Sequence, residues 1–163
     1  MAAGFPVTTI AFTKSKWDYR LNTYLGFTVP IGFDFDTANG ILRCRLEGKV
    51  TDEDVRALYR QATDHADAMK PRAGIIDLSG TTSFEVARET ILELAHTEPA
   101  VRDPKVTRVV IAGSPVVFGM ARMFEMEGER TRPNFYVVRT EQEAWAILQV
   151  WKPRFEPLKK NPS

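Results

Sequence analysis

The chain has 163 residues, with 22 lysines and arginines against 21 aspartates and glutamates, so its formal net charge is only +1. This length suits one domain with one buried core. The balanced charge excludes a protein that binds nucleic acid through its overall charge. Because Cys44 is the only cysteine, no intrachain disulfide can form. Neither histidine belongs to a metal-binding motif, so we expect no metal and no cofactor.

The two ends of the chain differ from its middle. Residues 1–30 hold scattered aromatic side chains without a period, and we interpret them as an N-terminal extension. Residues 152–163 are basic and rich in proline, so we expect a loose C-terminal tail after a folded domain of residues 31–151. Neither a secretory signal nor an apolar run of 18 residues occurs, which favours a cytoplasmic protein without a membrane span.

The first part of the expected domain, residues 31–46, predicts a β-hairpin. Two runs of alternating residues flank Asn39-Gly40, which is the strongest short signal for a two-residue turn. This turn pairs Ala38 with Ile41, Asp36 with Arg43, Asp34 with Arg45, Phe35 with Cys44, and Phe33 with Leu46. One face of the hairpin is then charged and the other is apolar, as expected for a sheet with one buried face.

Helices and strands alternate after the hairpin. The predicted order is a helix from Thr51 to the residue before Pro71, a strand at 74–78, a helix capped by 82–85 that ends near His96, a strand at 106–112, a helix at 114–128, a strand at 135–138, and a helix from Thr140 to Trp151. Strands joined by helices run parallel. We therefore predict an α/β fold with a mixed, mostly parallel five-stranded sheet, an antiparallel first strand at its edge, and helices mainly on one face. The N-terminal segment or a second subunit is expected to cover the other face.

Polar side chains gather after the strand that ends at Asp77. We take Asp77, Ser79, Thr82, Ser83 and Glu85 as a candidate switch or docking loop, because function in α/β domains concentrates at the carboxyl ends of strands. Asp77 is expected to bind N–H groups of the turn. The hydroxyl groups fit two roles: they cap the following helix, or they accept a phosphate or bind an anion.

A second candidate is a ligand pocket near the start of the helix at 114–128. Ser114, Gly119 and Arg122 are its candidate residues, since a helix N-terminus and an arginine both attract an anion. A catalytic site would require Asp77, Ser83, Ser114 and Arg122 to converge on one rim. No nucleophile elbow, P-loop or dinucleotide-binding glycine motif supports catalysis.

Two stretches carry a family resemblance: AGIIDLSGTTSF after the hairpin, and VVFGMARMFEMEGERTRPNFYVVRTEQEAWAIL near the C-terminus. They resemble STAS domains, and within them the bacterial SpoIIAA-like family related to anti-sigma-factor antagonists, over about residues 31–151. The resemblance implies that true antagonists are switched when a kinase phosphorylates a serine in Asp-Ser-Ser-Gly at the start of the second helix. Here Glu85, Val86, Ala87 and Arg88 stand at that place, so the acceptor serine is missing.

Taken together, the residues and the resemblance predict a non-catalytic regulatory module, not an enzyme. We expect it to bind a partner protein or a second copy of itself, and not to bind nucleic acid. Two alternatives stay open: a protein that binds a small anionic or apolar ligand, and an enzyme with its site at the carboxyl ends of the strands.

Overall fold

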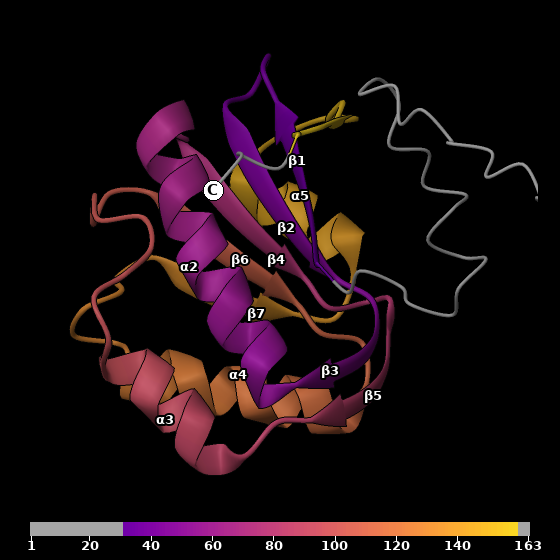
Figure 1. The fold of residues 1–163 in the computed structure, drawn as a ribbon. Coiled ribbons are helices and arrows are strands. Elements are labelled where there is room, and N and C mark those ends of the chain that lie inside the picture. Colours follow the sequence, from indigo (N-terminus) through magenta and orange to yellow (C-terminus); the bar gives the residue numbers. More distant parts are fainter. Residues whose placement is uncertain (1–30, 160–163) are drawn as a thin grey trace, which may run out of the picture.

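Residues 31–159 are the part of the chain that the structure, a computed structural model, describes (Figure 1). Its strands and helices are β1 (Ile31–Asp36), β2 (Ile41–Leu46), β3 (Gly48–Thr51), α2 (Asp52–Met69), β4 (Ala73–Asp77), β5 (Thr81–Glu85), α3 (Arg88–His96), β6 (Thr107–Ile111), α4 (Pro115–Glu127), β7 (Phe135–Val138), α5 (Glu141–Leu148) and β8 (Glu156–Pro157). The predicted alternation of helices and strands is confirmed, and β3, β5 and β8 are strands that we did not predict.

The main sheet has six strands in the order β7-β6-β4-β2-β1-β8. Strands β2, β4, β6 and β7 are parallel, whereas β1 runs antiparallel to both of its neighbours. The mixed, mostly parallel sheet is therefore confirmed. Its strand number was predicted one too low, because β8 adds to β1, so that β1 is not the edge of the sheet.

Three of the four described helices, α2, α3 and α4, lie on one side of the main sheet, and α5 lies on the other (Figure 1). The larger core is formed on the first side, where Phe33, Leu42, Cys44, Val110 and Phe135 are among the buried sheet residues. The smaller core lies under α5 and includes Ile75 and Val109, which point to the opposite face because side chains alternate along a strand. The expected N-terminal cover lies outside the described residues.

The hairpin register differs from the prediction by two residues. Asp34 lies opposite Arg43, Phe33 lies opposite Cys44, and Asp36 lies opposite Ile41. The turn therefore has four residues, because the Asp36 carboxylate accepts hydrogen bonds from the Asn39 N–H (3.1 Å) and side-chain amide (2.7 Å). A shift of two residues keeps every side chain on its face, so the predicted charged and apolar faces are correct although the pairs are not.

Asp34 forms a buried charge cluster with two arginines on the face that α5 partly covers. Its carboxylate is 2.7 Å from the Nε atom of Arg45 and 3.0 Å from a terminal nitrogen of Arg43. Asp34 is only 2% exposed, while both arginines are partly exposed. A buried charge requires such partners, because an isolated carboxylate is strongly destabilised away from water.

Helix starts follow the predicted local signals at three places. The Asp54 carboxylate accepts hydrogen bonds from the Thr51 N–H (2.8 Å) and hydroxyl (2.7 Å) at the start of α2. Ser114 caps α4 by accepting a bond from the Val117 N–H (3.3 Å), and Thr140 caps α5 through a capping box. Capping satisfies amide groups that have no partner within the helix, which is why these boundaries were predictable.

The segment from Lys152 to Lys159 is not a loose tail. The backbone N–H of Arg154 donates to the Asp36 carboxylate (3.0 Å), and the N–H of Leu158 donates to the Phe33 carbonyl (2.8 Å). Between these two residues, the guanidinium carbon of Arg43 lies over the Phe155 ring, 3.9 Å from the ring centroid. The segment thus covers part of the sheet face beside α5, which the basic composition of the segment did not reveal.

Two arginines, Arg108 and Arg132, are buried on the side of the larger core. Each guanidinium donates to backbone carbonyl groups, and within residues 31–159 neither contacts a carboxylate. Arg132 binds the carbonyl groups at the end of α3, namely Leu94, Ala95 and Thr97. The negative end of the helix dipole favours a cation there.

Candidate functional site

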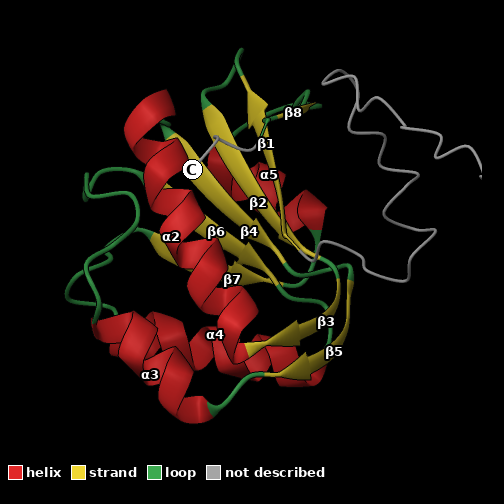
Figure 2. Ribbon diagram, in the orientation of Figure 1, coloured by secondary structure: helices red, strands yellow, loops and turns green. Residues whose placement is uncertain are grey.

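The predicted switch or docking loop does not start a helix. Residues Thr81–Glu85 form β5, which pairs in parallel with β3 in a separate two-stranded sheet (Figure 2). The Gly48 N–H donates to the Gly80 carbonyl (2.9 Å) and brings the two strands into line. The predicted capping box at 82–85 is therefore wrong, and α3 begins only at Arg88.

Asp77 closes the turn between the main sheet and this small sheet. The buried carboxylate accepts hydrogen bonds from the Ser79 N–H (3.0 Å) and the Ser79 hydroxyl (2.5 Å). This geometry is the local side-chain turn that we predicted for Asp77. One oxygen of this carboxylate, Oδ1, accepts both bonds and holds the turn. The Thr81 hydroxyl donates to the Leu46 carbonyl (3.3 Å).

A second set of contacts joins the N-termini of α2 and α3. The Asp52 carboxylate accepts a hydrogen bond from the Ala87 N–H (2.8 Å), and this bond lowers the pKa of Asp52. One turn later, Arg56 donates to the Thr90 hydroxyl (3.1 Å) and to Glu93 (2.9 Å). An acid from one helix thus caps its neighbour, so the two helix starts are fixed relative to each other.

The outer face of the small sheet carries an exposed ion pair. The Nζ atom of Lys49 lies 2.9 Å from a carboxylate oxygen of Glu85, and the two side chains are 61% and 56% exposed. The hydrogen bond from Lys49 lowers the pKa of Glu85. The Ser83 hydroxyl also donates to Glu85 (3.3 Å). We call the surface formed by Lys49, Thr82, Ser83, Glu85 and Arg88 the docking edge.

Val86, one of the residues that the resemblance places at the family's serine motif, is buried with 8% exposure. Its side chain belongs to the larger core. The neighbouring Glu85 and Arg88 are exposed. The chain therefore has a buried apolar side chain at Val86 and permanently charged, exposed side chains, Glu85 and Arg88, beside it.

The predicted ligand pocket residues have other local roles. Ser114 caps α4, and Arg122 forms an ion pair with Glu125 one turn away in the same helix. A methyl group added at Gly119 would meet no atom within 4 Å, so the glycine borders open space. A nearby cavity of about 440 Å³, beside Phe118, is lined by none of these three residues. Their role in ligand binding remains a prediction.

The four residues of the hypothetical catalytic rim bind separate partners. Asp77 is paired with Ser79, Ser83 with Glu85, Ser114 with the start of α4, and Arg122 with Glu125. No hydrogen bond or ion pair connects any two of the four. In the described part of the chain, no three metal-ligating side chains form a group that could hold an ion, and no helix is long and apolar enough to cross a membrane.

Sequence reasoning missed Lys49 and Asp52 as parts of this surface. Lys49 lies between a glycine and an acidic run, which gave no reason to assign it to a strand. Asp52 stands in the first turn of a helix, where the helix dipole alone accounts for an acidic residue. Its contact with Ala87, 35 residues away, depends on the pairing of β3 with β5, and no local pattern signals it.

Neither a protein-family model nor a curated protein sequence matches the chain. Among solved structures, the chain is similar to the anti-sigma factor antagonist SpoIIAA in its unphosphorylated form, with a TM-score of 0.48 and 13% sequence identity, over 73% of this chain and 97% of that chain. This similarity concerns the arrangement of strands and helices alone. The function must therefore be inferred from this chain's own residues.

Proposed function

We propose that this protein is a non-catalytic regulatory module that binds a partner protein through the docking edge. The observation that carries this proposal is that two sets of bonds hold the docking edge in place. On one side β5 pairs with β3, and on the other the Ala87 N–H donates to the Asp52 carboxylate. A surface held in one shape loses little conformational entropy when it binds, and this favours association with another surface.

The use of the polar groups supports binding over catalysis. Asp77 and Ser83, the groups best placed to act as base and nucleophile, are 2.5 Å and 3.3 Å from partners within their own turn or strand. A catalytic pair would need each group within reach of the other or of a shared reacting atom. The exposed ion pair of Lys49 and Glu85 instead offers both signs of charge for recognition.

Control of binding in this proposal does not use phosphorylation at the family position. Val86 has no hydroxyl group and is buried, so Glu85 and Arg88 present constant charges beside it. The proposal keeps the bacterial origin implied by the resemblance, and the cytoplasmic location expected from the single Cys44. Self-association through the same edge is the alternative to a separate partner.

The test is capture of partners by the tagged full-length chain from its host, followed by native mass spectrometry. We expect Glu85→Lys and Arg88→Glu each to remove a complex that the unaltered chain forms. Glu129→Lys is the matched control, because it makes the same charge change at an exposed residue outside the docking edge.

The double variant Lys49→Glu with Glu85→Lys separates two explanations. It restores an ion pair within the chain but inverts the charges that a partner meets. If the double variant forms the complex again, the ion pair only stabilises the shape of the docking edge. If the complex stays lost, the partner contacts the charges of Lys49 and Glu85 directly. If the complex forms in all these variants, the proposal that the partner binds the docking edge is wrong. If the chain catalyses a reaction, and Asp77→Asn abolishes the turnover while the chain stays folded, the enzyme alternative is favoured.

A further inference from the structure

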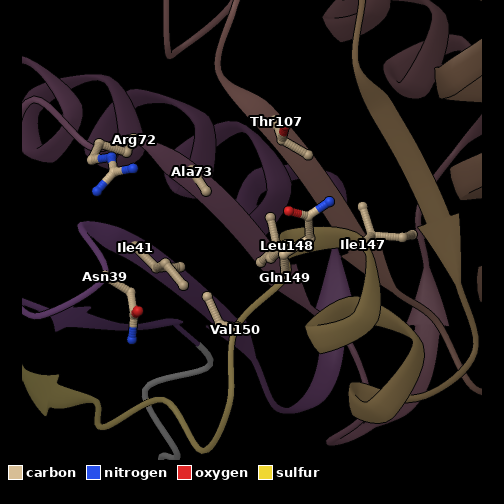
Figure 3. A pocket seen from close by; sticks show the side chains of 9 residues that line it. All are labelled: Asn39, Ile41, Arg72, Ala73, Thr107, Ile147, Leu148, Gln149 and Val150. Carbon is tan, nitrogen blue, oxygen red and sulfur yellow. The ribbon is translucent and has the colours of Figure 1, made fainter.

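A cavity of about 470 Å³ lies at the amino ends of β4 and β6, at the opposite end of the main sheet from the docking edge (Figures 1 and 3). Four separate segments meet around it. Its lining consists of Asn39 and Ile41 from the hairpin, Arg72 and Ala73 from the start of β4, Thr107 from β6, and Ile147, Leu148, Gln149 and Val150 from the end of α5. The volume lies within the range of about 300–1,000 Å³ that is usual for small-molecule sites.

Four polar side chains, from Asn39, Arg72, Thr107 and Gln149, line this cavity. Within residues 31–159, the Arg72 guanidinium, the Thr107 hydroxyl and the Gln149 side-chain amide make no hydrogen bond or ion pair. The Asn39 amide nitrogen donates to Asp36 (2.7 Å), which leaves its oxygen as an acceptor. No carboxylate is among the lining residues. The cavity therefore combines one positive charge with neutral donors and acceptors, and it selects for a negatively charged ligand.

The backbone around Arg72 is held in place by the hairpin turn. The N–H groups of Arg72 and Ala73 both donate to the Gly40 carbonyl, at 2.8 Å and 3.3 Å. Gly40 has a φ of +66°, and a Cβ atom added there would lie 3.2 Å from the Arg72 side-chain carbons. The turn thus needs glycine both for its left-handed conformation and to leave room for the arginine stem. These contacts fix the backbone and the first side-chain carbons of Arg72, so the arginine stem starts from a defined place while its guanidinium stays exposed.

An apolar wall, buried or partly buried, lies behind the polar groups of the cavity. Ile41 and Ala73 are buried at 1% and 8% exposure, and Leu148 and Val150 pack against the same smaller core. Gln149 follows α5 with a φ of +54°, and this left-handed residue turns the chain so that Val150 also lines the cavity. A short hydrocarbon part of a ligand would contact this wall.

We propose that this cavity binds a small organic anion. Its carboxylate or phosphate group pairs with Arg72, its hydroxyl or carbonyl groups bind Thr107 and Gln149, and a short carbon skeleton contacts the partly exposed Val150. The site shares no residue with the docking edge, so it stands independently of the proposed partner binding.

The test uses the ¹⁵N-labelled full-length chain, titrated at constant ionic strength with malate and with glycerol 3-phosphate. Glycerol and choline serve as neutral and cationic controls. We expect at least one of the two anions to cause saturable shifts of the Asn39, Thr107 and Gln149 amide signals, and neither control to do so. Arg72→Gln should weaken the binding at least tenfold, and Thr107→Val severalfold.

Arg130→Gln is the matched control, because Arg130 is also exposed and has no ion pair among the described residues. The proposal is overturned if neither anion causes saturable shifts, if glycerol binds as well as glycerol 3-phosphate, or if Arg72→Gln and Arg130→Gln have equal effects. A spectrum of Arg72→Gln without ligand shows whether this variant folds, and Thr107→Val supplies the same comparison if it does not.

Discussion

Replacing Arg132 with methionine tests whether a buried guanidinium holds the end of α3. Arg132 is 4% exposed and donates to the carbonyl groups of Ala95 (2.5 Å), Thr97 (2.7 Å) and Leu94 (2.9 Å). Methionine keeps an unbranched chain of similar length in the core but donates no hydrogen bond. The substitution therefore removes the bonds while disturbing the packing little.

The expected loss follows from the carbonyl groups that remain. Leu94 keeps a bond from the Thr97 N–H (3.2 Å), whereas the Ala95 carbonyl cannot bind an amide four residues on, because residue 99 is proline. The buried Ala95 carbonyl thus loses its donor, at a cost of about 1–3 kcal/mol, whereas the carbonyl of Thr97, an exposed residue, can bind water instead. Removing a buried charge offsets part of this cost. We expect the free energy of unfolding to fall by about 2 kcal/mol, a substantial share of the usual 5–15 kcal/mol.

The assay is urea denaturation followed by circular dichroism, with hydrogen exchange of the α3 amides as a local measurement. Arg132→Lys should lose less stability than Arg132→Met, because an ammonium group can still bind one or two of the carbonyl groups. Arg130→Met is the control at an exposed position and should change the free energy by less than about 0.5 kcal/mol. A loss below about 1 kcal/mol for Arg132→Met, or a loss equal to the control, would refute the reasoning.

Three further variants or conditions test other buried groups. Asp34→Asn leaves Arg43 and Arg45 without their shared carboxylate. We expect the free energy of unfolding, measured in the same assay, to fall by about 2–3 kcal/mol, because both arginines keep some access to water. Unchanged stability would mean that the cluster does not stabilise the fold. Burial lowers the pKa of His65, so the unfolded chain binds its proton first and stability should fall as the pH drops below about 6.5. His65→Gln should reduce this loss between pH 7.5 and pH 5.5, and an identical pH profile would argue against the assignment. Burial also raises the pKa of Cys44, so iodoacetamide at pH 8 should label it only after unfolding; rapid labelling of the folded chain would show that the thiol is accessible.

The parts of the fold that depend on short-range rules were predictable. Ser114 followed by Pro115, and Thr140 followed by Glu143, identified the starts of α4 and α5, because a cap involves residues only three positions apart. The faces of the hairpin were predictable for a similar reason: alternation survives a two-residue slip. Which residues of β1 and β2 lie opposite each other was not predictable, because the hydrogen bonds between Asp36 and Asn39 stabilise a longer turn than the Asn-Gly signal indicates.

The candidate site was predictable only as a place in the chain. The turn role of Asp77 is confirmed, but Thr82, Ser83 and Glu85, predicted as part of a loop, lie in strand β5. The run Thr82–Glu85 satisfies the local rule for a helix cap, but it pairs with β3, more than 30 residues earlier. A short parallel pair of this kind is stabilised by tertiary contacts, and its residues carry no alternation long enough to predict a strand.

Strand β8 has a consequence for how the chain can be shortened. A fragment ending at residue 151, the domain limit that the sequence suggests, would lack β8, which among the described residues is the strand that pairs with the outer side of β1. Such an open edge invites pairing between molecules and aggregation. In the intact chain a strand of only two residues covers β1, and Pro157 has no N–H group to offer a neighbouring strand. These last described residues therefore help to keep the folded chain from associating edge to edge.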